Sequence, residues 1–173
     1  MKILFLIFSL FVSSQAVAQS LQQQINAAEA AGGGIVQLPC GTFTNNGFPV
    51  ALPPLVTIKG SGACTAIPAV VTKYPTVRTY YLSIQDLYIQ PSLINSPYIA
   101  IDFRNVTQAY IKNVVIPCST TNYQTGLLLA YTSQYALVEN LYACTTVDAV
   151  ELYSGANQNT FIGGKLSSPI GFN

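Results

Sequence analysis

The chain has 173 residues and a net charge of +1 at pH 7, and its composition is 50% hydrophobic and only 8% charged. Seven Lys and Arg residues and no His are too few to form the basic stripe of a nucleic-acid surface, so nucleic acid is excluded as a partner. A chain of this length builds one modest core rather than two domains.

Residues 1–18 have the form of a secretory signal peptide. A short positively charged start precedes an apolar run over residues 3–12, and residues 16–18 (Ala-Val-Ala) have the small-x-small pattern of a signal-peptidase site. The alternative is a membrane anchor, but the run is too short to span a bilayer. We therefore expect cleavage after Ala18, no membrane span, and a secreted protein that is extracellular or periplasmic.

A capping helix is predicted directly after this segment. Ser20 is a favourable helix N-cap, and residues 21–31 are rich in Ala and Gln, with apolar side chains on one face. Three consecutive glycines then end the helix. We assign residues 19–34 to this helix and its Gly-rich turn, which would cover the open end of a repetitive β structure.

Five short segments share one pattern, an apolar residue followed two positions later by Gly, Asp or Asn. Their starts are 24 to 27 residues apart, as in stacked structural repeats. Gly, Asn and Asp enter the left-handed backbone region at low cost, so each segment predicts a tight turn at the same place in its coil. We therefore assign residues 35–173 to a parallel β-helix of about five to six coils. The five segments are Ile58-Lys59-Gly60, Ile84-Gln85-Asp86, Ile111-Lys112-Asn113, Val138-Glu139-Asn140 and Ile162-Gly163-Gly164.

The four cysteines are spaced by about one repeat. Residues one repeat apart in a stacked coil lie about 4.8 Å from each other, within the Cα range of a disulfide. We predict the disulfides Cys40–Cys64 and Cys118–Cys144, which fit an oxidising compartment. The alternative is a set of buried free thiols. A zinc site is not expected, because the chain has no His and no Cys-x-x-Cys pair.

Residues 25–28 (Ile-Asn-Ala-Ala), 32–39 (Gly-Gly-Gly-Ile-Val-Gln-Leu-Pro) and 41–43 (Gly-Thr-Phe) resemble the N-terminal cap and first coil of the pectate-lyase-like superfamily. The resemblance implies a right-handed parallel β-helix with polysaccharide as its partner. It does not indicate which reaction is performed, because that superfamily includes lyases, hydrolases, epimerases and phage tailspikes.

A second set of strands is read at residues 98–103, 126–131 and 149–154. By resemblance, the sheet that such strands form is the floor of a substrate groove. Alternation with period two predicts two inward rows and two outward rows. The inward rows are Ile99, Leu127, Val150 and Ile101, Leu129, Leu152; the outward rows are Ala100, Leu128, Glu151 and Asp102, Ala130, Tyr153.

Asp102, Asp148 and Glu151 are the candidate catalytic residues. Glycoside hydrolysis needs two carboxylates about 5 to 5.5 Å apart for retention, or about 6.5 to 9.5 Å apart for inversion. In the predicted register the Cα atoms of Asp102 and Glu151 are about 12 Å apart, too far unless the side chains lean together. Asp148 is where polygalacturonases, by resemblance, carry an acidic residue, but the other motifs of that family are missing here.

A lyase reaction would instead need several carboxylates around Ca²⁺ and a basic residue to remove a proton. The six acidic residues form no evident cluster, so no metal site and no cofactor are predicted, with Ca²⁺ kept only for the case of a lyase. Arg104 and Lys112 are the basic residues nearest to Asp102 and are candidates to contact a uronate. The alternative for each, and for Asp102 and Glu151, is an ordinary surface residue.

Tyrosines support a second interpretation, a binding module without catalysis. The chain has eleven Tyr residues, and Tyr98, Tyr123 and Tyr153 are predicted to lie exposed in or beside the groove. The flat face of a Tyr ring suits stacking on a sugar. The alternative is a stacked ladder with a purely structural role.

The last repeat, from Phe161, is followed by no capping helix in this sequence, although solenoids need capped ends. This predicts either end-to-end or homo-oligomeric association through the uncapped coil, or a shortened relative of larger enzymes. The predicted function is a secreted protein acting on polysaccharide, most readily a uronate-containing glycan, as a lyase or glycoside hydrolase. The alternatives are a non-catalytic glycan-binding or surface-interaction module, or a remnant of a larger enzyme.

Overall fold

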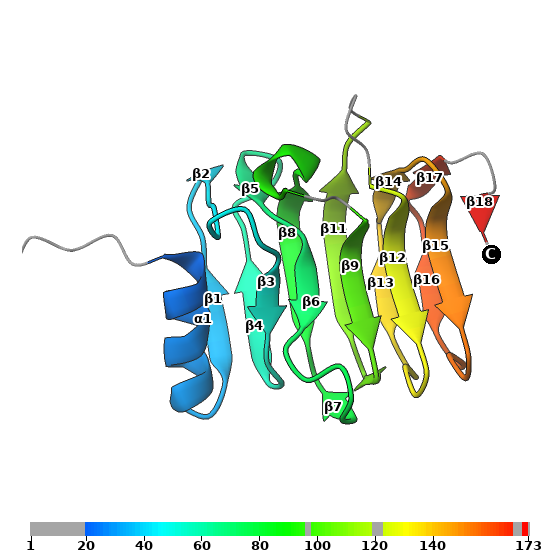
Figure 1. Ribbon diagram of the computed structural model, residues 1–173, viewed down its shortest axis with the longest axis horizontal. Helices are drawn as coiled ribbons and strands as arrows, with labels where there is room; N and C mark the ends of the chain where they lie inside the picture. Colours follow the sequence, from blue (N-terminus) through cyan, green and yellow to red (C-terminus); the bar gives the residue numbers. More distant parts are fainter. Residues whose placement is uncertain (1–19, 96–97, 119–122, 168–170, 173) are drawn as a thin grey trace, which may run out of the picture.

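The protein is a parallel β-solenoid whose coils stack from the N-terminal helix to the last strand (Figure 1). The computed structural model describes residues 20–95, 98–118, 123–167 and 171–172. The predicted signal peptide, residues 1–18, lies outside these described residues. The predicted all-β solenoid with a short N-terminal helix is confirmed, with about five turns.

Two parallel sheets form the main walls, and in each sheet neighbouring strands come from successive coils. Sheet A contains β1 (Gly34–Gln37), β2 (Gly41–Thr42), β4 (Val56–Lys59), β5 (Thr65–Ile67), β8 (Ser83–Ile89), β11 (Tyr110–Ile116), β13 (Leu137–Glu139), β14 (Tyr142–Cys144), β16 (Thr160–Ile162) and β17 (Lys165–Ser167). Sheet B contains β3 (Val50–Leu52), β6 (Val70–Thr72), β9 (Ile99–Arg104), β12 (Thr125–Ala130), β15 (Asp148–Tyr153) and β18 (Gly171–Phe172). A third, short pair is formed by β7 (Thr79–Tyr80) and β10 (Val106–Thr107), and the 3₁₀ turn η1 (Pro91–Leu93) lies between β8 and β9.

The core consists of rows of apolar side chains, each row running from coil to coil. In sheet A, Ile58, Ile84, Ile111 and Val138 are neighbours in register and at most 1% exposed, as the repeat pattern predicts. Such rows remove apolar surface from water between coils, and this supplies most of the stability of a solenoid.

The predicted register of sheet B is wrong by two residues at β9. Leu127 pairs with Ile101, not with Ile99, and Leu129 pairs with Phe103. The pairing of β12 with β15 is as predicted, with Leu127 beside Val150. A slip of two residues keeps every side chain on the same face of the sheet, so alternation alone cannot detect it.

The predicted register of the last repeat is wrong by one residue. Phe161, rather than Ile162, pairs with Val138 in the core row. Ile162 pairs with Glu139 and is 52% exposed. Because side chains alternate between faces, a slip of one residue moves Ile162 to the outside.

The predicted left-handed turn is present in four of the five segments, and in three of them its side chains form a ladder. Asp86, Asn113 and Asn140 have φ of 53°, 51° and 53°, and their side chains bond from coil to coil. The amide of Asn113 donates to Asp86 at 2.7 Å, and that of Asn140 donates to Asn113 at 3.0 Å. In the last repeat the predicted Gly164 has φ of 92°, and Gly163, with φ of 65°, continues the stack in register with Asn140.

Gly60 does not share this conformation, so that part of the prediction is wrong. Its φ is not positive, and an added Cβ would lie 2.3 Å from the carbonyl oxygen of Asp86. Gly60 therefore fits a close approach of two backbones and not a left-handed turn.

A second stack of left-handed turns has residues that give no sequence signal. It lies directly before the strands of sheet A, and all its members have φ between 56° and 63°: Leu55, Tyr81, Gln108, Tyr135 and Gln158. A shorter third stack follows sheet B at Asn105, Tyr131 and Ser154. Non-glycine residues cost about 1–2 kcal/mol in this region, so packing of the coils imposes these turns.

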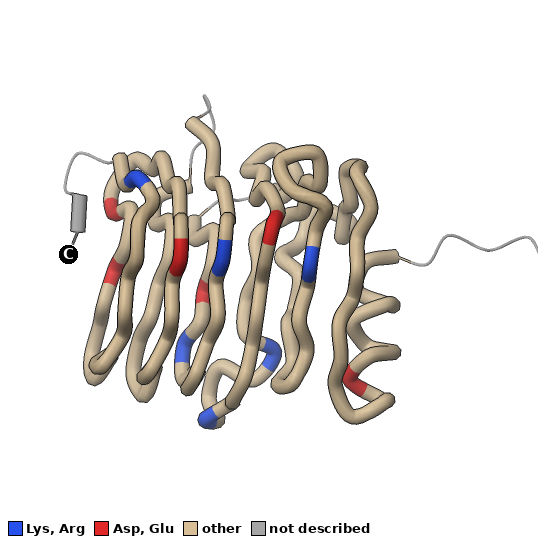
Figure 2. Tube along the Cα trace, turned by 180° about the vertical axis from the view of Figure 1, so that it is seen from behind, with Lys and Arg blue, Asp and Glu red and all other residues tan. Residues whose placement is uncertain are grey.

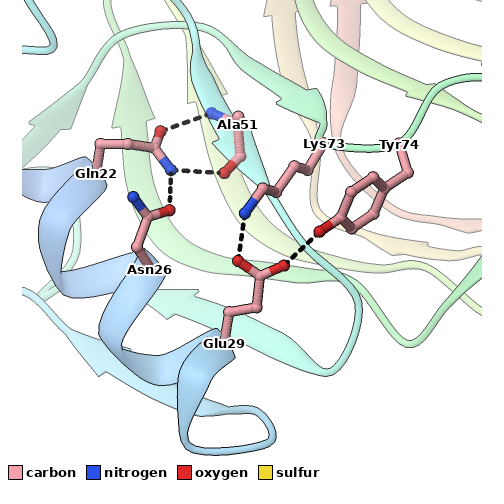
Figure 3. Close-up of polar contacts among 6 residues, drawn as sticks. All are labelled: Gln22, Asn26, Glu29, Ala51, Lys73 and Tyr74. Atoms are coloured by element: carbon pink, nitrogen blue, oxygen red, sulfur yellow. Dashed lines mark hydrogen bonds and ion pairs between the residues drawn. The ribbon is translucent and has the colours of Figure 1, made fainter.

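The helix α1 (Leu21–Ala30) covers the first coil, as predicted (Figure 1). Ser20 and Gln23 form a capping box, and Leu21 and Ile25 are buried. Polar side chains fasten the helix to two coils (Figure 3). Gln22 bonds the backbone of Ala51, and Glu29 contacts Lys73 and Tyr74.

Both predicted disulfides are confirmed, Cys40–Cys64 and Cys118–Cys144, with Cα–Cα distances of 4.8 and 4.9 Å. In the described part of the chain, no helix has the length and apolar character needed to cross a membrane. Charged residues are sparse along the coils (Figure 2), and three ion pairs, Lys73–Glu29, Arg104–Asp102 and Lys112–Glu139, join six of those described.

Candidate functional site

The outer face of sheet B brings Asp102 and Glu151 into one row. Leu128 pairs with Asp102 on one side and with Glu151 on the other. Two strand spacings separate the backbones of these acidic residues, about 9.6 Å, so the predicted 12 Å is wrong. Leu128, which is 9% exposed, lies between the two acidic residues.

Asp148 lies at the start of the same strand as Glu151. The two residues between them, Ala149 and Val150, both belong to the core, and the register with β18 shifts at this point. Two consecutive inward residues at a bulge place Asp148 and Glu151 on the same, outer side of β15. Asp148 is only 6% exposed, and its Oδ1 accepts no hydrogen bond within the described structure.

Asp102 does not stand free, because it forms a two-pronged ion pair with Arg104. The Nε of Arg104 donates to Oδ1 at 2.8 Å and its Nη2 donates to Oδ2 at 2.5 Å. The two residues are two positions apart on β9 and therefore lie on the same face. Asp102 is 3% exposed, whereas 41% of the Arg104 side chain is exposed. The hydrogen bond to Asp102 raises the pKa of Arg104 above its ordinary value.

Arg104 lies on the wall of an open cavity of about 440 Å³, which we call the Arg104 pocket. The other lining residues are Pro75, Thr76, Asn105 and Tyr131. Asn105 joins two walls of the pocket. Its Nδ2 donates to the carbonyl of Pro75 at 2.7 Å, and its Oδ1 accepts from Thr132 Oγ1 at 3.0 Å. The loop between β6 and β7 is thereby held against the end of sheet B.

Tyr131, which lines the pocket, contacts a second exposed tyrosine, Tyr153. Tyr131 and Tyr153 come from successive coils and meet edge to face, with ring centroids 6.4 Å apart and an interplanar angle of 82°. They are 44% and 57% exposed. The exposure predicted for Tyr153 is therefore confirmed. Tyr131 and Asn105 were missed in the sequence, although each directly follows a strand of sheet B and both occupy the same turn position.

The remaining predicted binding residues lie elsewhere. Tyr98 is 61% exposed, but it precedes β9 and so lies at the opposite end of that strand from Arg104. Tyr123 is fully buried, so its predicted exposure is wrong; burial raises its pKa. Its hydroxyl donates to the carbonyl of Gln90 at 3.4 Å, which gives the ring a core position between coils.

Lys112 was predicted to lie near Asp102, but it is on sheet A and does not belong to the same site. It pairs with Glu139 at 3.4 Å, and Tyr110 also donates to Glu139. The hydrogen bonds to Tyr110 and Glu139 raise the pKa of Lys112. Lys112 and Arg104 are thus on different walls of the solenoid.

No group of three or more His, Cys, Asp or Glu side chains that could hold a metal ion is found among the residues that the structure describes. Calcium prefers six to eight oxygen ligands, several of them charged. The described side chains around Asp102 therefore do not fit a calcium site, since its carboxylate is already taken by Arg104.

No family model and no curated protein matches the chain. Among solved structures, it is similar to a protein from Parabacteroides merdae whose crystal structure is described as a "putative glycosyl hydrolase". The TM-score is 0.57 with 10% identity, and the match covers 86% of each chain. At this identity the likeness is one of fold.

Proposed function

We propose that this protein binds polysaccharide without cleaving it, and that the outer face of sheet B and the Arg104 pocket form the contact surface. The observation that carries the proposal is the combination of an oriented, half-exposed guanidinium with two exposed tyrosine rings at an open cavity. Fold likeness to a protein described as a "putative glycosyl hydrolase" supports a glycan partner by analogy only.

The chemistry of these groups suits a sugar chain. Tyr rings offer flat apolar faces with a hydroxyl at the edge, which matches the mixed character of a sugar ring. A guanidinium has five N–H donors, of which Asp102 takes two, so three are left for hydroxyl or ring oxygens. Because sheet B continues through successive coils, a long polymer can contact several of them.

Retention of the purified protein on a panel of insoluble and soluble polysaccharides tests this proposal. Tyr131→Ala and Arg104→Gln should each weaken binding at least about fivefold, since each removes a stacking face or a set of donors. Tyr142→Ala is the matched control, because Tyr142 is 48% exposed but lies on sheet A. Failure to bind any polymer, or an equal loss in Tyr142→Ala, would refute the proposal.

A hydrolase is the second candidate, and one observation favours it. Asp148 and Glu151 share one side of β15, and three residues of a bulged strand place them about 7 to 10 Å apart, a range that overlaps the spacing for inversion. Release of reducing ends or of unsaturated uronate, measured with and without Ca²⁺, tests this. If wild type shows turnover, and Glu151→Gln and Asp148→Asn lose it with the fold intact, the protein is an enzyme and the binding proposal is wrong.

We also propose that the protein works outside the cytoplasm. Two disulfides join neighbouring coils, and all four cysteines are at least partly exposed, so a reducing compartment would open them. Determining the N-terminal residue of the protein isolated from its natural source would test the cleavage expected after Ala18.

A further inference from the structure

We infer that Asp102 makes the Arg104 pocket selective for uncharged sugars, so that the site favours neutral or esterified residues over free uronates. The inference rests on the proposed glycan binding and names the substrate class of that same site. It differs from the sequence-based expectation, in which Arg104 is a candidate to contact a uronate.

The lining of the Arg104 pocket carries one charged side chain. Arg104 is the single charged residue among the five that line it, and the others are Pro75, Thr76, Asn105 and Tyr131. Asp102 contributes a full negative charge at hydrogen-bond distance through both of its oxygens. The guanidinium and carboxylate therefore cancel, and the pocket presents N–H donors without a net charge.

Asp102 is buried beneath Arg104. Its side chain is 5% exposed, so water screens the pair poorly and a ligand cannot displace Arg104 from it at low cost. A uronate that reached the free N–H groups of Arg104 would bring a second carboxylate close to that of Asp102. The repulsion offsets the attraction to Arg104, while the uronate still loses hydration.

The other charged residues near the pocket add no cation to its lining. Two basic residues flank Pro75 and Thr76 in the adjoining loop, and one of them, Lys73, already pairs with Glu29. Glu151, two coils from Asp102 in the outward row, adds negative charge to the same face. Arg78 is exposed in the same loop but does not line the pocket. A neutral hydroxyl or an ester carbonyl is the acceptor that this arrangement favours.

The experiment compares tetragalacturonate with its fully methyl-esterified form, alongside a panel of neutral polysaccharides, by calorimetry at low and high NaCl. Wild-type protein should bind the ester or a neutral glycan at least as tightly as the free acid, and with little dependence on salt. Asp102→Asn keeps the side-chain size but frees the charge of Arg104. It should strengthen binding of the free acid about tenfold relative to the ester, and this gain should fade in high salt.

Glu139→Gln is the matched control, because it removes one carboxylate from an ion pair on sheet A and changes the net charge equally. It should leave the preference unchanged. Tighter binding of the free acid by wild type, or the same shift in Glu139→Gln, would overturn the inference and leave the proposed binding in place. Absence of binding to every glycan would overturn the proposed function itself. If Asp102→Asn fails to fold, the preference of wild type for the ester over the free acid, and its salt dependence, still test the inference.

Discussion

The side-chain amide of Gln22 pairs with the backbone of Ala51 as a neighbouring strand would. Its Oε1 accepts from the Ala51 N–H at 2.9 Å, and its Nε2 donates to the Ala51 carbonyl at 3.0 Å (Figure 3). Ala51 lies in β3, the first strand of sheet B, whose outer edge has no strand partner among the described residues. One helical side chain thus satisfies part of an edge that would otherwise be open to another chain.

Replacing Gln22 by Ala should therefore lower the free energy of unfolding by about 1–2 kcal/mol, the range expected for two partly buried hydrogen bonds. Gln22→Glu should cost at least as much, because its carboxylate would face the Ala51 carbonyl. Urea denaturation measures both. Gln124→Ala is the control, since its exposed side chain bonds none of the described residues. An effect of Gln22→Ala no larger than that of the control would contradict the role assigned to the pair.

In the stack of left-handed turns that precedes the strands of sheet A, replacement by glycine should raise the stability. Gln108 is exposed and has φ of 63°, so Gln108→Gly should raise stability by up to about 1 kcal/mol, because glycine adopts this conformation without a steric penalty. Gln85→Gly, in the extended backbone of β8, should instead lower stability by at least about 0.5 kcal/mol. Thermal denaturation of the two variants should show opposite signs; shifts of the same sign would refute the strain argument.

The Asp86–Asn113–Asn140 ladder predicts a pH-dependent variant. Asn113→Asp places a second carboxyl against Asp86, where Asn113 now donates at 2.7 Å. Repulsion raises the pKa of the introduced carboxyl in the folded state. The variant should therefore be destabilised at neutral pH, and the deficit should shrink as the pH falls through that raised pKa.

Asn113→Ala separates charge from geometry. It removes both ladder bonds and places Ala at a φ of 51°, which should cost about 1–3 kcal/mol at every pH. Urea midpoints between about pH 3 and pH 7 compare the two variants. A deficit of Asn113→Asp that does not change over this range would argue against contact between the two carboxyl groups.

Glu29 predicts a small loss of stability in acid. Hydrogen bonds from Lys73 and then Tyr74 hold the pKa of Glu29 below its ordinary value of 4.5. A lowered pKa contributes stability above pH 4.5, and this contribution is lost as the pH falls through the lower, folded-state pKa. Acidification should therefore lower the free energy of unfolding of Glu29→Gln less than that of wild type. The difference should be below about 1 kcal/mol, because the pair is partly exposed.

Urea midpoints of Glu29→Gln and wild type from neutral to acidic pH measure this difference. Glu151→Gln is the control, since Glu151 forms no ion pair with the described residues. If both variants flatten the acid limb equally, the contact between α1 and Lys73 contributes no measurable stability.

Much of the fold was predictable because it depends on local or periodic features. Ser20, the Gln-rich and Ala-rich segment and the three glycines encode the capping helix through local hydrogen bonding and backbone freedom. Cys40 and Cys64 are 24 residues apart, close to the length of one coil, so the stacking period alone brings them together. The same holds for the row of Ile58, Ile84, Ile111 and Val138.

The candidate site was predictable only in part. Asp102, Glu151 and Tyr153 were recognised as outward residues of sheet B, and Arg104 as a basic residue near Asp102; the structure places all four on that face. The sequence analysis did not place Asp102 and Glu151 in one row, because the predicted row placed Asp102 beside Ala130 instead of Leu128. The Arg104 pocket also needs Pro75 and Thr76 from a loop of the preceding coil, a contact between segments about 30 residues apart.

Local signals and the repeat spacing were enough to predict the period of the coils, the capped start and the pairing of the cysteines. Each of these repeats at a fixed spacing or is completed within a few residues. The register of β9, the left-handed turns at Tyr81, Gln108 and Tyr135, and the neutralisation of Arg104 by Asp102 depend instead on contacts between coils. The physical reason is that a slip of two residues leaves hydrophobic alternation unchanged. Packing between coils then selects one register, and with it the side chains that share the outer face.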